Sequence, residues 1–415
     1  MNNTNKILPI LRFSGFTENW KFKKLGDFSD VSKLAGYEFT KHIVYQNKGS
    51  IIALRGLNIK KNSLNLNDVK YIDNSEFSKL NRSKLYIDDL MFTYIGTIGE
   101  VALIEENDRF YLAPNVSRIR FNRDIAFPKF MLQYFCRSKF KNKEVKTYVS
   151  SSSQPALTME SLRKFKISFP NLQEQQKIAS FLSDVDDKIT KLTKKKDLLE
   201  QYKKGVMQKI FNQELRFKDD NGNNFPNWQK TKLGKSVKFL KGKGLPKSEI
   251  VCDGQYKCIH YGELFTKYNE LIDNIISRTN DNDKTVLSKV NDVLMPTSDV
   301  TPNGLATASC IKESDVILGG DVLIIRQDIK KIEGVYLAYY IKHFRNDVMK
   351  LVSGSTVYHL YGSDMKNLQV LIPCLDEQIK IANFLTDIDL KITVLNTKIE
   401  SNRTFKKGLL QKMFV

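Results

Sequence analysis

The sequence predicts an α+β protein in which two similar α+β domains are joined by two long antiparallel coiled-coil helices, with a pseudo-two-fold internal repeat. A segment beginning at Pro170 matches a second segment beginning at Pro373 without a gap, at about half of the aligned positions. Apolar residues recur every seven positions within both segments. The rest of the chain consists of short apolar runs separated by Gly, Asn and Ser, which is typical of short strands and turns.

The repeat extends beyond these two segments. Residues 11–13 (Leu-Arg-Phe) and Trp20 return in the second half as residues 215–217 and Trp228. The chain is therefore a tandem duplication whose ends agree and whose bodies have diverged, as expected for two readers that share a scaffold and recognise different targets. Identical pairs include Glu174/Glu377, Gln175/Gln378, Ile178/Ile381, Ala179/Ala382, Phe181/Phe384, Asp186/Asp389, Ile189/Ile392 and Gly205/Gly408.

The repeat predicts four segments along the chain. The first globular domain covers residues 1–169 and is followed by a central helix over 170–212. The second globular domain covers 213–372 and is followed by a C-terminal helix over 373–415. Each globular domain should combine short strands with one helical stretch and close with a strand before the proline. The expected strands are 51–54, 90–94, 101–104, 116–121 and 165–169, then 293–295, 316–318, 322–325 and 368–372, and the expected helices are 129–140 and 335–349.

The two long helices have apolar seams that can pair with each other. A compact second domain is entered from the end of the first helix and left into the start of the second, so the helices should run antiparallel. Lys196, Lys203 and Lys406 fall in seam rows, where lysine can fix the register, but we expect their stems simply to extend toward solvent. The seams contain Ile178, Leu182, Val185, Ile189, Leu192, Leu199, Val206 and Ile210, and Ile381, Leu385, Ile388, Ile392, Leu395, Ile399, Leu409 and Met413.

Length, charge and cysteine content narrow the class of protein. A chain of 415 residues suits two or more domains. The 66 Lys+Arg against 46 Asp+Glu give a net charge of +20, which predicts a polyanionic partner, although lysine-rich codon usage also produces basic proteins. No apolar run has the length of a membrane helix, so we expect a cytoplasmic protein without membrane contact. Five scattered cysteines without a Cys-x-x-Cys pair fit a reducing compartment and indicate no zinc site.

Catalytic motifs are not recognisable in the sequence. The Asn-Pro-Pro-aromatic and Asp-Pro-Pro-aromatic stretches that amino-methyltransferases use are absent. Residues 234–236 (Gly-Lys-Ser) resemble the end of a phosphate-binding loop, but Gln229 stands where that pattern needs glycine. The four histidines have no metal-ligand spacing. We therefore expect no catalytic residue and no metal site.

The ends of the repeats resemble those of a known family. Each helix opens with Pro-x-Leu-x-Glu-Gln-x-x-Ile-Ala-x-Phe-Leu, from Pro170 and from Pro373, and closes with Lys-Lys-Gly-x-x-Gln-Lys-x-Phe. The doubled motif, with the segments around Trp20 and Trp228, resembles the specificity (S) subunits of bacterial type I restriction-modification systems over essentially the whole chain. The resemblance implies two target recognition domains that each read one half of a bipartite DNA target. It also implies that the helices set the gap between the half-sites and dock modification subunits.

The same resemblance implies the partners and cofactors. Double-stranded DNA, two modification (methyltransferase) subunits and restriction (endonuclease/translocase) subunits are the expected partners. S-adenosylmethionine, ATP and Mg²⁺ are expected on the partner subunits, whereas this chain is expected to bind no cofactor and to be non-catalytic. Two other hypotheses remain open: a fused restriction enzyme or methyltransferase with unrecognised catalytic motifs, and a coiled-coil adaptor without a nucleic-acid role.

Polar loop residues of both domains are the expected DNA contacts. Lysine and arginine would bind phosphates, while Asn, Gln, Ser, Thr, Arg and Tyr would read base edges. In the first domain we expect contacts from Arg55, Lys60, Lys61, Tyr94, Thr97, Ser152 and Gln154. In the second we expect them from Lys241, Lys243, Thr297, Ser298, Thr301, Asn303, Ser355, Thr356 and Tyr358.

Overall fold

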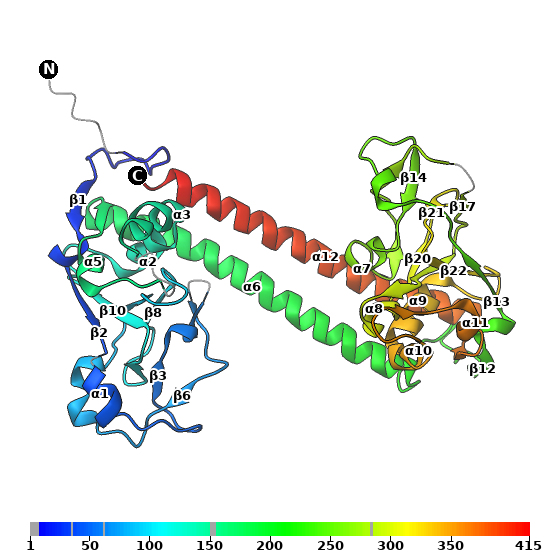
Figure 1. Ribbon diagram of the computed structural model, residues 1–415, viewed down its shortest axis with the longest axis horizontal. Coiled ribbons are helices and arrows are strands. Elements are labelled where there is room, and N and C mark those ends of the chain that lie inside the picture. The colour runs from blue at the N-terminus through cyan, green and yellow to red at the C-terminus, as the bar shows by residue number, and fades with distance from the viewer. Residues whose placement is uncertain (1–7, 35, 61–62, 150–154, 283–284) are drawn as a thin grey trace. The chain divides into compact units, whose positions relative to one another are not determined.

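The protein divides into two compact units whose boundaries fall inside its two long helices. Unit 1 comprises Met1–Thr193 and Thr397–Val415, and unit 2 comprises Lys194–Asn396. The long helices are α6 (Leu172–Phe211) and α12 (Leu375–Lys412), and both can be followed in Figure 1. Each unit therefore combines one globular body with the start of one helix and the end of the other. The computed structural model describes residues 8–34, 36–60, 63–149, 155–282 and 285–415.

The body of unit 1 is built around a four-stranded antiparallel sheet with the strand order β2-β10-β7-β8. A three-stranded sheet, β6-β3-β9, and the pairs β1-β11 and β4-β5 accompany it. The main sheet consists of β2 (Ser29–Lys33), β7 (Leu90–Thr93), β8 (Val101–Leu103) and β10 (Val116–Phe121). The other strands are β1 (Lys21–Lys24), β3 (Ile52–Leu54), β4 (Ile59–Lys60), β5 (Ser63–Leu64), β6 (Lys70–Tyr71), β9 (Phe110–Leu112) and β11 (Lys166–Phe169).

Among the short helices of unit 1, α2 contributes several large side chains to the core. Its residues Phe130, Met131, Tyr134 and Phe135 are buried, because this spacing places them on one face of the helix. Pro128 opens α2, where its missing amide donor is not needed. The α-helices of this body are α1 (Gly36–Lys41), α2 (Pro128–Cys136), α3 (Ser138–Phe140), α4 (Lys146–Tyr148) and α5 (Met159–Arg163).

Unit 2 has a five-stranded sheet with the order β13-β22-β18-β20-β15. In this sheet β15 and β20 pair in parallel, and the other neighbouring strands pair antiparallel. A four-stranded sheet, β16-β14-β21-β17, and the pairs β12-β24 and β19-β23 complete the body. The five strands are β13 (Val237–Lys241), β15 (Leu271–Ile272), β18 (Val293–Pro296), β20 (Ser309–Ile311) and β22 (Val322–Gln327). The others are β12 (Gln229–Lys232), β14 (Tyr256–Ile259), β16 (Arg278–Thr279), β17 (Val286–Leu287), β19 (Ser298–Asp299), β21 (Ile317–Leu318), β23 (Tyr358–His359) and β24 (Gln369–Ile372).

The helix α9 has the same place in unit 2 as α2 has in unit 1. It is more apolar than α2, and eight consecutive residues from Gly334 to Ile341 are buried. The α-helices of this body are α7 (Glu263–Thr266), α8 (Pro302–Leu305), α9 (Gly334–His343), α10 (Arg345–Met349) and α11 (Gly362–Met365).

In both units the core continues from the body into the helix pair. The core of unit 1 contains Ile178 and Leu182 from the start of α6 together with Leu409 near the end of α12 and Met413 just after it. The core of unit 2 has the reciprocal composition, with the end of α6 and the start of α12. Within each unit the start of one long helix therefore packs beside the end of the other, so the antiparallel pairing expected from the connectivity is confirmed. The long-helix residues in the core of unit 2 are Val206, Met207, Ile210, Phe211, Ile381, Ala382, Leu385 and Ile388.

The predicted α+β class, the two long helices and the repeat are confirmed. Each expected strand is present with small shifts at its ends. The two stretches expected as single helices are both divided, 129–140 into α2 and α3 and 335–349 into α9 and α10. The polar strands β1 and β12 were not predicted, because their alternating lysines give no apolar pattern. They pair with the predicted closing strands β11 and β24. The four predicted segment boundaries stay a prediction.

Candidate nucleic-acid interface

In unit 2 four segments from distant parts of the chain meet at one group of loops, which we call the loop cluster of unit 2. The Thr297 amide donates to the carbonyl oxygen of Asp321 over 2.9 Å, and the Leu360 amide donates to that of Thr297 over 3.0 Å. The Gly242 amide donates to the carbonyl oxygen of Val322 over 2.8 Å. With the β19-β23 pairing, these bonds join the end of β13, the β21–β22 turn, β19 and β23.

The Asp321 carboxylate is the common partner of three residues that were predicted to contact DNA. Thr297 Oγ1 and Ser298 Oγ donate to it over 3.4 and 3.5 Å, and Lys241 Nζ lies 3.6 Å away. The Lys241 and Asp321 side chains are 64% and 44% exposed, whereas Thr297 is 6% exposed. Lys241 is therefore accessible to a phosphate, while Thr297 mainly holds the turn.

Arg345 adds a cation to the loop cluster that sequence reasoning did not identify. Its Nη2 donates to Asn303 Oδ1 over 2.8 Å, and Thr301 Oγ1 donates to Asp299 Oδ2 over 2.8 Å. Arg345 and Asn303 are 42 residues apart, so no local pattern connects them. A guanidinium beside an amide can serve either a phosphate or a base edge. Of the remaining predicted residues, Lys243, Ser355 and Thr356 are exposed and Tyr358 is half-buried.

The predicted residues of unit 1 lie on separate elements. Arg55 Nη2 donates to the main-chain oxygen of Asp68 over 2.9 Å and to its carboxylate over 3.2 Å. Lys60 is exposed at the end of β4. Arg55 thus has a structural contact within its own body, whereas Lys60 is the more accessible of the two cations.

Tyr94 and Thr97 follow β7 and differ in exposure. Tyr94 is 9% exposed and belongs to the core, with Lys33 Nζ 5.7 Å from its ring centre. Burial raises the pKa of its hydroxyl. Thr97 is exposed. The Leu157 amide donates to the Tyr94 carbonyl oxygen over 2.9 Å, which matches the bond from Leu360 to Thr297, so both units connect the same two loops.

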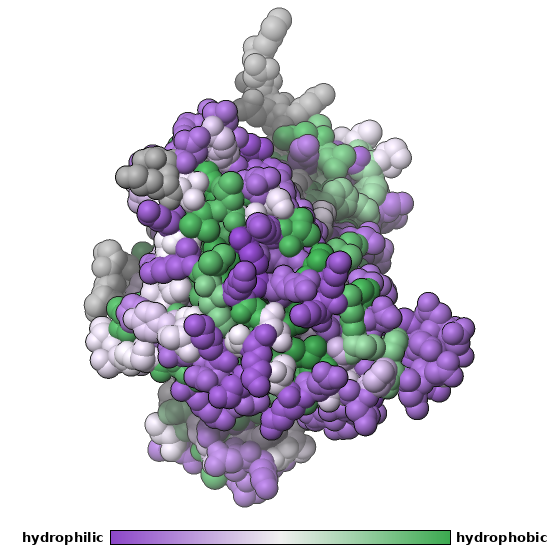
Figure 2. Space-filling model, turned by 90° about the vertical axis from the view of Figure 1, so that its right-hand side faces the viewer, coloured by the Kyte–Doolittle hydropathy of each residue, from purple (hydrophilic) through white to green (hydrophobic). Residues whose placement is uncertain are grey.

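Three predicted DNA-contacting residues, Lys61, Ser152 and Gln154, lie outside the described residues. The DNA contacts proposed for both units stay predictions. In the view of Figure 2, hydrophilic side chains cover most of the surface and separate its hydrophobic patches.

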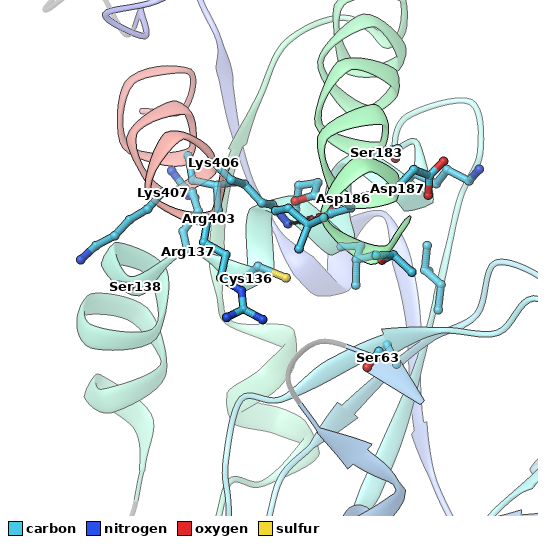
Figure 3. A pocket seen from close by; sticks show the side chains of 18 of the residues that line it. Ser63, Cys136, Arg137, Ser138, Ser183, Asp186, Asp187, Arg403, Lys406 and Lys407 are labelled. Carbon is cyan, nitrogen blue, oxygen red and sulfur yellow. Dashed lines mark hydrogen bonds and ion pairs between the residues drawn. The ribbon is translucent and has the colours of Figure 1, made fainter. Parts of the chain in front are cut away.

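In unit 1 an aspartate ties the helix pair to the body. Asp186 on α6 accepts from Lys406 Nζ of α12 at both carboxylate oxygens, over 2.6 and 2.7 Å. It also accepts from Gln133 Nε2 of α2 over 2.8 Å. The expectation that Lys406 extends toward solvent is wrong, because its ammonium ion is held by this carboxylate. Figure 3 shows Asp186 and Lys406 on facing helices.

Unit 2 repeats this junction with Asp389 on α12. Lys203 Nζ donates to both of its oxygens over 2.6 Å, so the expectation for this lysine is also wrong. The Tyr339 hydroxyl donates to Asp389 over 2.5 Å. Burial and the nearby Asp389 raise the pKa of Tyr339, which keeps the hydroxyl protonated as a donor. Lys196 instead lies 3.6 Å from Glu200 on its own helix.

A second matched junction fixes the start of each long helix. Glu174 is fully buried and accepts two hydrogen bonds of 2.7 Å from the Arg12 guanidinium. In unit 2 the buried Glu377 accepts from Arg216 over 3.1 and 2.7 Å and from the Trp228 indole over 3.0 Å. The signal for these contacts was the identity of the residue pairs across the repeat, to which sequence reasoning assigned no role.

The glutamine that follows each of these glutamates closes the turn into the helix. Gln175 Nε2 donates to the Pro170 carbonyl oxygen over 2.9 Å, and Gln378 Nε2 donates to that of Pro373 over 2.9 Å. These bonds explain why a glutamine stands five residues after the proline in both repeats.

Within the described residues, no cluster of three or more His, Cys, Asp or Glu side chains is arranged to bind a metal ion. None of the described helices is both long enough and apolar enough to span a bilayer.

Two relatives match much of the chain. A putative type I restriction enzyme MjaX specificity subunit from Methanocaldococcus jannaschii is 25% identical over 412 residues, which is 95% of this chain and 92% of the relative. The MjaVIII type I restriction enzyme specificity subunit from the same organism is 26% identical over 293 residues, which is 67% of this chain and 68% of the relative.

Solved structures share the fold. The crystal structure of a type I restriction-modification system S subunit from M. genitalium has a TM-score of 0.65 at 15% identity and covers 98% of this chain and 99% of that chain. A structure that concerns complex assembly and conformational transition of the type I R-M system has a TM-score of 0.54 at 17% identity, with 95% and 97% covered.

A family model described as the type I restriction modification DNA specificity domain matches this chain twice. The matched residues are 17–201 and 226–401. Each match includes one body and a large part of the long helix that follows it. The chain therefore belongs to the family of type I restriction-modification DNA specificity domains and carries that domain twice.

Proposed function

We propose that this chain, a type I restriction-modification DNA specificity protein by family, reads a bipartite DNA target with one half-site for each unit. The observation that carries the proposal is that two units with matched helix junctions hold the same pair of loops, while the residues in those loops differ. The net charge of +20 supports a DNA partner, since phosphate contacts supply much of the affinity of such proteins. Double-stranded DNA is therefore the ligand of both units.

The long helices also offer a surface for protein partners. Leu198 and Tyr202 on α6 and Leu390 and Val394 on α12 are about half exposed, as is Phe405. A spacing of four residues places each pair on one face of its helix. Apolar side chains exposed on helices in this way support docking of two modification subunits and, through them, restriction subunits. S-adenosylmethionine, ATP and Mg²⁺ would be bound by those partners, and this chain would be non-catalytic.

Exchange of one body tests the assignment of half-sites. Residues 25–169 would be replaced by those of another family member, and the variant would be expressed with the modification subunits in cells. Mapping of methylated bases should show one changed half-site and one unchanged half-site. The matched exchange of residues 233–372 should change the other half-site only. Alteration of both half-sites by either exchange would contradict independent readers.

The non-catalytic role has a separate test. The purified chain alone should neither retain S-adenosylmethionine in equilibrium dialysis nor cleave plasmid DNA with ATP and Mg²⁺. Binding or cleavage by the chain alone would instead favour a fused enzyme.

A further inference from the structure

Unit 1 contains a cavity of about 1300 Å³ between α2, the first part of α6 and the last part of α12. Figure 3 shows labelled side chains from these helices, among them Cys136 of α2, Asp186 of α6 and Lys406 of α12. Leu132, Ile189 and Leu410 supply apolar wall, so the cavity is neither wholly polar nor wholly apolar.

The charged residues that line this cavity are mostly basic. The acidic ones are Glu105, Asp186 and Asp187, of which Asp186 is already paired with Lys406. The basic residues are Lys129, Arg137, Lys139, Arg403, Lys406 and Lys407. In the described part of the chain, Lys129, Lys139 and Lys407 take part in no ion pair, and all three are exposed. The cavity is therefore suited to a negatively charged occupant.

The repeat identifies which residues of unit 2 match this cavity. The Tyr134 hydroxyl accepts from the Ser168 amide over 3.1 Å, and the Tyr340 hydroxyl accepts from the Leu371 amide over 3.1 Å. Tyr134 on α2 and Tyr340 on α9 thus have the same place before the closing strand. Two residues further along each helix, Cys136 in unit 1 matches Lys342 in unit 2.

In unit 2 the matching place is filled by a carboxylate of the chain itself. Glu270 is 3% exposed and forms an ion pair with Lys342. Its Oε2 lies 3.5 Å from Lys203 Nζ, the lysine that also holds Asp389. In unit 2 the place between the ammonium groups of Lys342 and Lys203 is therefore occupied by a buried carboxylate.

Unit 1 has a cavity at the place that corresponds to Glu270. Lys406 is the match of Lys203, and both Lys406 and Cys136 line the cavity. Burial raises the pKa of the Cys136 thiol to about 12, so this residue stays neutral and adds no charge. Glu270 directly precedes β15, which lies beside β20, and in unit 1 the strand beside β8 is β5. In the sequence β5 is preceded by Lys61 and Asn62, which are not acidic and lie outside the described residues.

We propose that the cavity of unit 1 binds an acidic peptide segment of a partner protein, with one side-chain carboxylate beside Lys406 in the place that Glu270 occupies in unit 2. Lys129, Lys139 and Lys407 pair with further carboxylates of the segment at the rim. The apolar wall accommodates the methylene groups of glutamate side chains. The presence of Glu270 is the reason to propose a carboxylate rather than a DNA phosphate, because a carboxylate occupies the matching place in unit 2.

Peptide binding by the full chain tests this proposal. The probe is a fluorescein-labelled oligoglutamate peptide, followed by fluorescence anisotropy, with an oligoglutamine peptide as the neutral control. Each of Lys129→Gln, Lys139→Gln and Lys407→Gln should weaken binding about 2- to 5-fold, and the triple variant at least about tenfold. Lys204→Gln, which changes the match of Lys407 in unit 2, should leave the affinity unchanged. Equal affinities of the triple variant and the parent chain would overturn the proposal.

A gain of affinity provides a second, independent measurement. Cys136→Lys copies the cation of unit 2 into the cavity and should tighten oligoglutamate binding about 2- to 5-fold. Weaker or unchanged binding by a folded Cys136→Lys chain would count against the proposed position of the carboxylate. A short DNA duplex is the competitor. If the duplex displaces the peptide from the parent chain, and the triple variant loses affinity for the duplex to the same extent, the cavity binds DNA and the proposal is overturned.

Discussion

Lys203 connects two helices and a body through one ammonium group. Its side chain is 13% exposed, it contacts both oxygens of Asp389, and it lies 5.0 Å from the centre of the Tyr339 ring. Loss of one partner from a mostly buried ion pair leaves the other charge without compensation. Lys203 should therefore contribute far more to stability than an exposed lysine on the same helix.

The variant Lys203→Met tests this contribution. We expect the free energy of unfolding to fall by about 2–3 kcal/mol, because Asp389 and the buried Glu270 both lose a cationic partner. Urea unfolding of the full chain measures the change. The control Lys204→Met alters an exposed neighbour and should change the free energy of unfolding by less than about 0.5 kcal/mol. Equal effects of the two exchanges would show that the ion pair contributes little.

At the scale of secondary-structure elements, the matched glycines Gly205 and Gly408 weaken the long helices in which they lie. Glycine in a helix costs about 0.5–1 kcal/mol relative to alanine. A Cβ atom added at either position would meet no heavy atom within 4 Å. Packing within the described chain therefore does not require glycine at either position.

Gly205→Ala and Gly408→Ala should each stabilise the protein by about 0.5–1 kcal/mol, because alanine lowers the entropy cost of helix formation. Thermal unfolding of the isolated chain measures this as a higher melting temperature. Gly242→Ala is the matched contrast, since its Cβ would lie 2.0 Å from the carbonyl oxygen of Gly319 and must destabilise. A lower melting temperature for Gly205→Ala would reveal a contact that the structure does not contain.

The helices α6 and α12 are also the elements proposed to set the gap between the half-sites. Insertion of four residues after Thr193 adds about 6 Å of helix, close to two base pairs at about 3.4 Å each. A single insertion also breaks the pairing of the seams, so we expect weaker binding. A compensating insertion of four residues after Asn396 should restore the pairing. Both insertion points coincide with the boundary between the two units.

Methylation mapping with the modification subunits present measures the gap of the double insertion variant. We expect an active double variant to modify sites whose gap has increased by about two base pairs. Modification of the original gap by this variant would show that the helices do not set the spacing.

At the scale of the whole molecule, a net charge of +20 predicts a strong salt dependence of DNA binding. The logarithm of the association constant should fall with the logarithm of salt concentration, with a slope of about −0.9 for each phosphate neutralised. Lys60→Ala and Lys243→Ala should each reduce the magnitude of the slope by about 0.9 without altering sequence preference. Filter binding or anisotropy at several salt concentrations measures the slope, and a slope near zero would remove the electrostatic argument.

The predicted DNA-contacting residues show which part of a site a sequence can indicate. In unit 2 the choice of polar loop residues led to Lys241 and Ser298, which lie around the Asp321 carboxylate, and their contact with DNA stays a prediction. The same reasoning selected Tyr94, whose burial depends on how the loop after β7 packs against the body. It missed Arg345, because contact with Asn303 depends on a helix that returns from far along the chain.

The sequence by itself determined the duplication, the two long helices and most of the strands, because apolar periodicity is a local property of neighbouring residues. Only the tertiary structure decided which charges meet. Lys203 and Asp389 are 186 residues apart and form an ion pair because the helices run antiparallel within unit 2. The packing of each body against its helices likewise decides two further features. Glu270 contacts Lys342 in unit 2, and a cavity lies at the matching place in unit 1. Long-range contacts of this kind have no periodic pattern, so the folded chain alone reveals them.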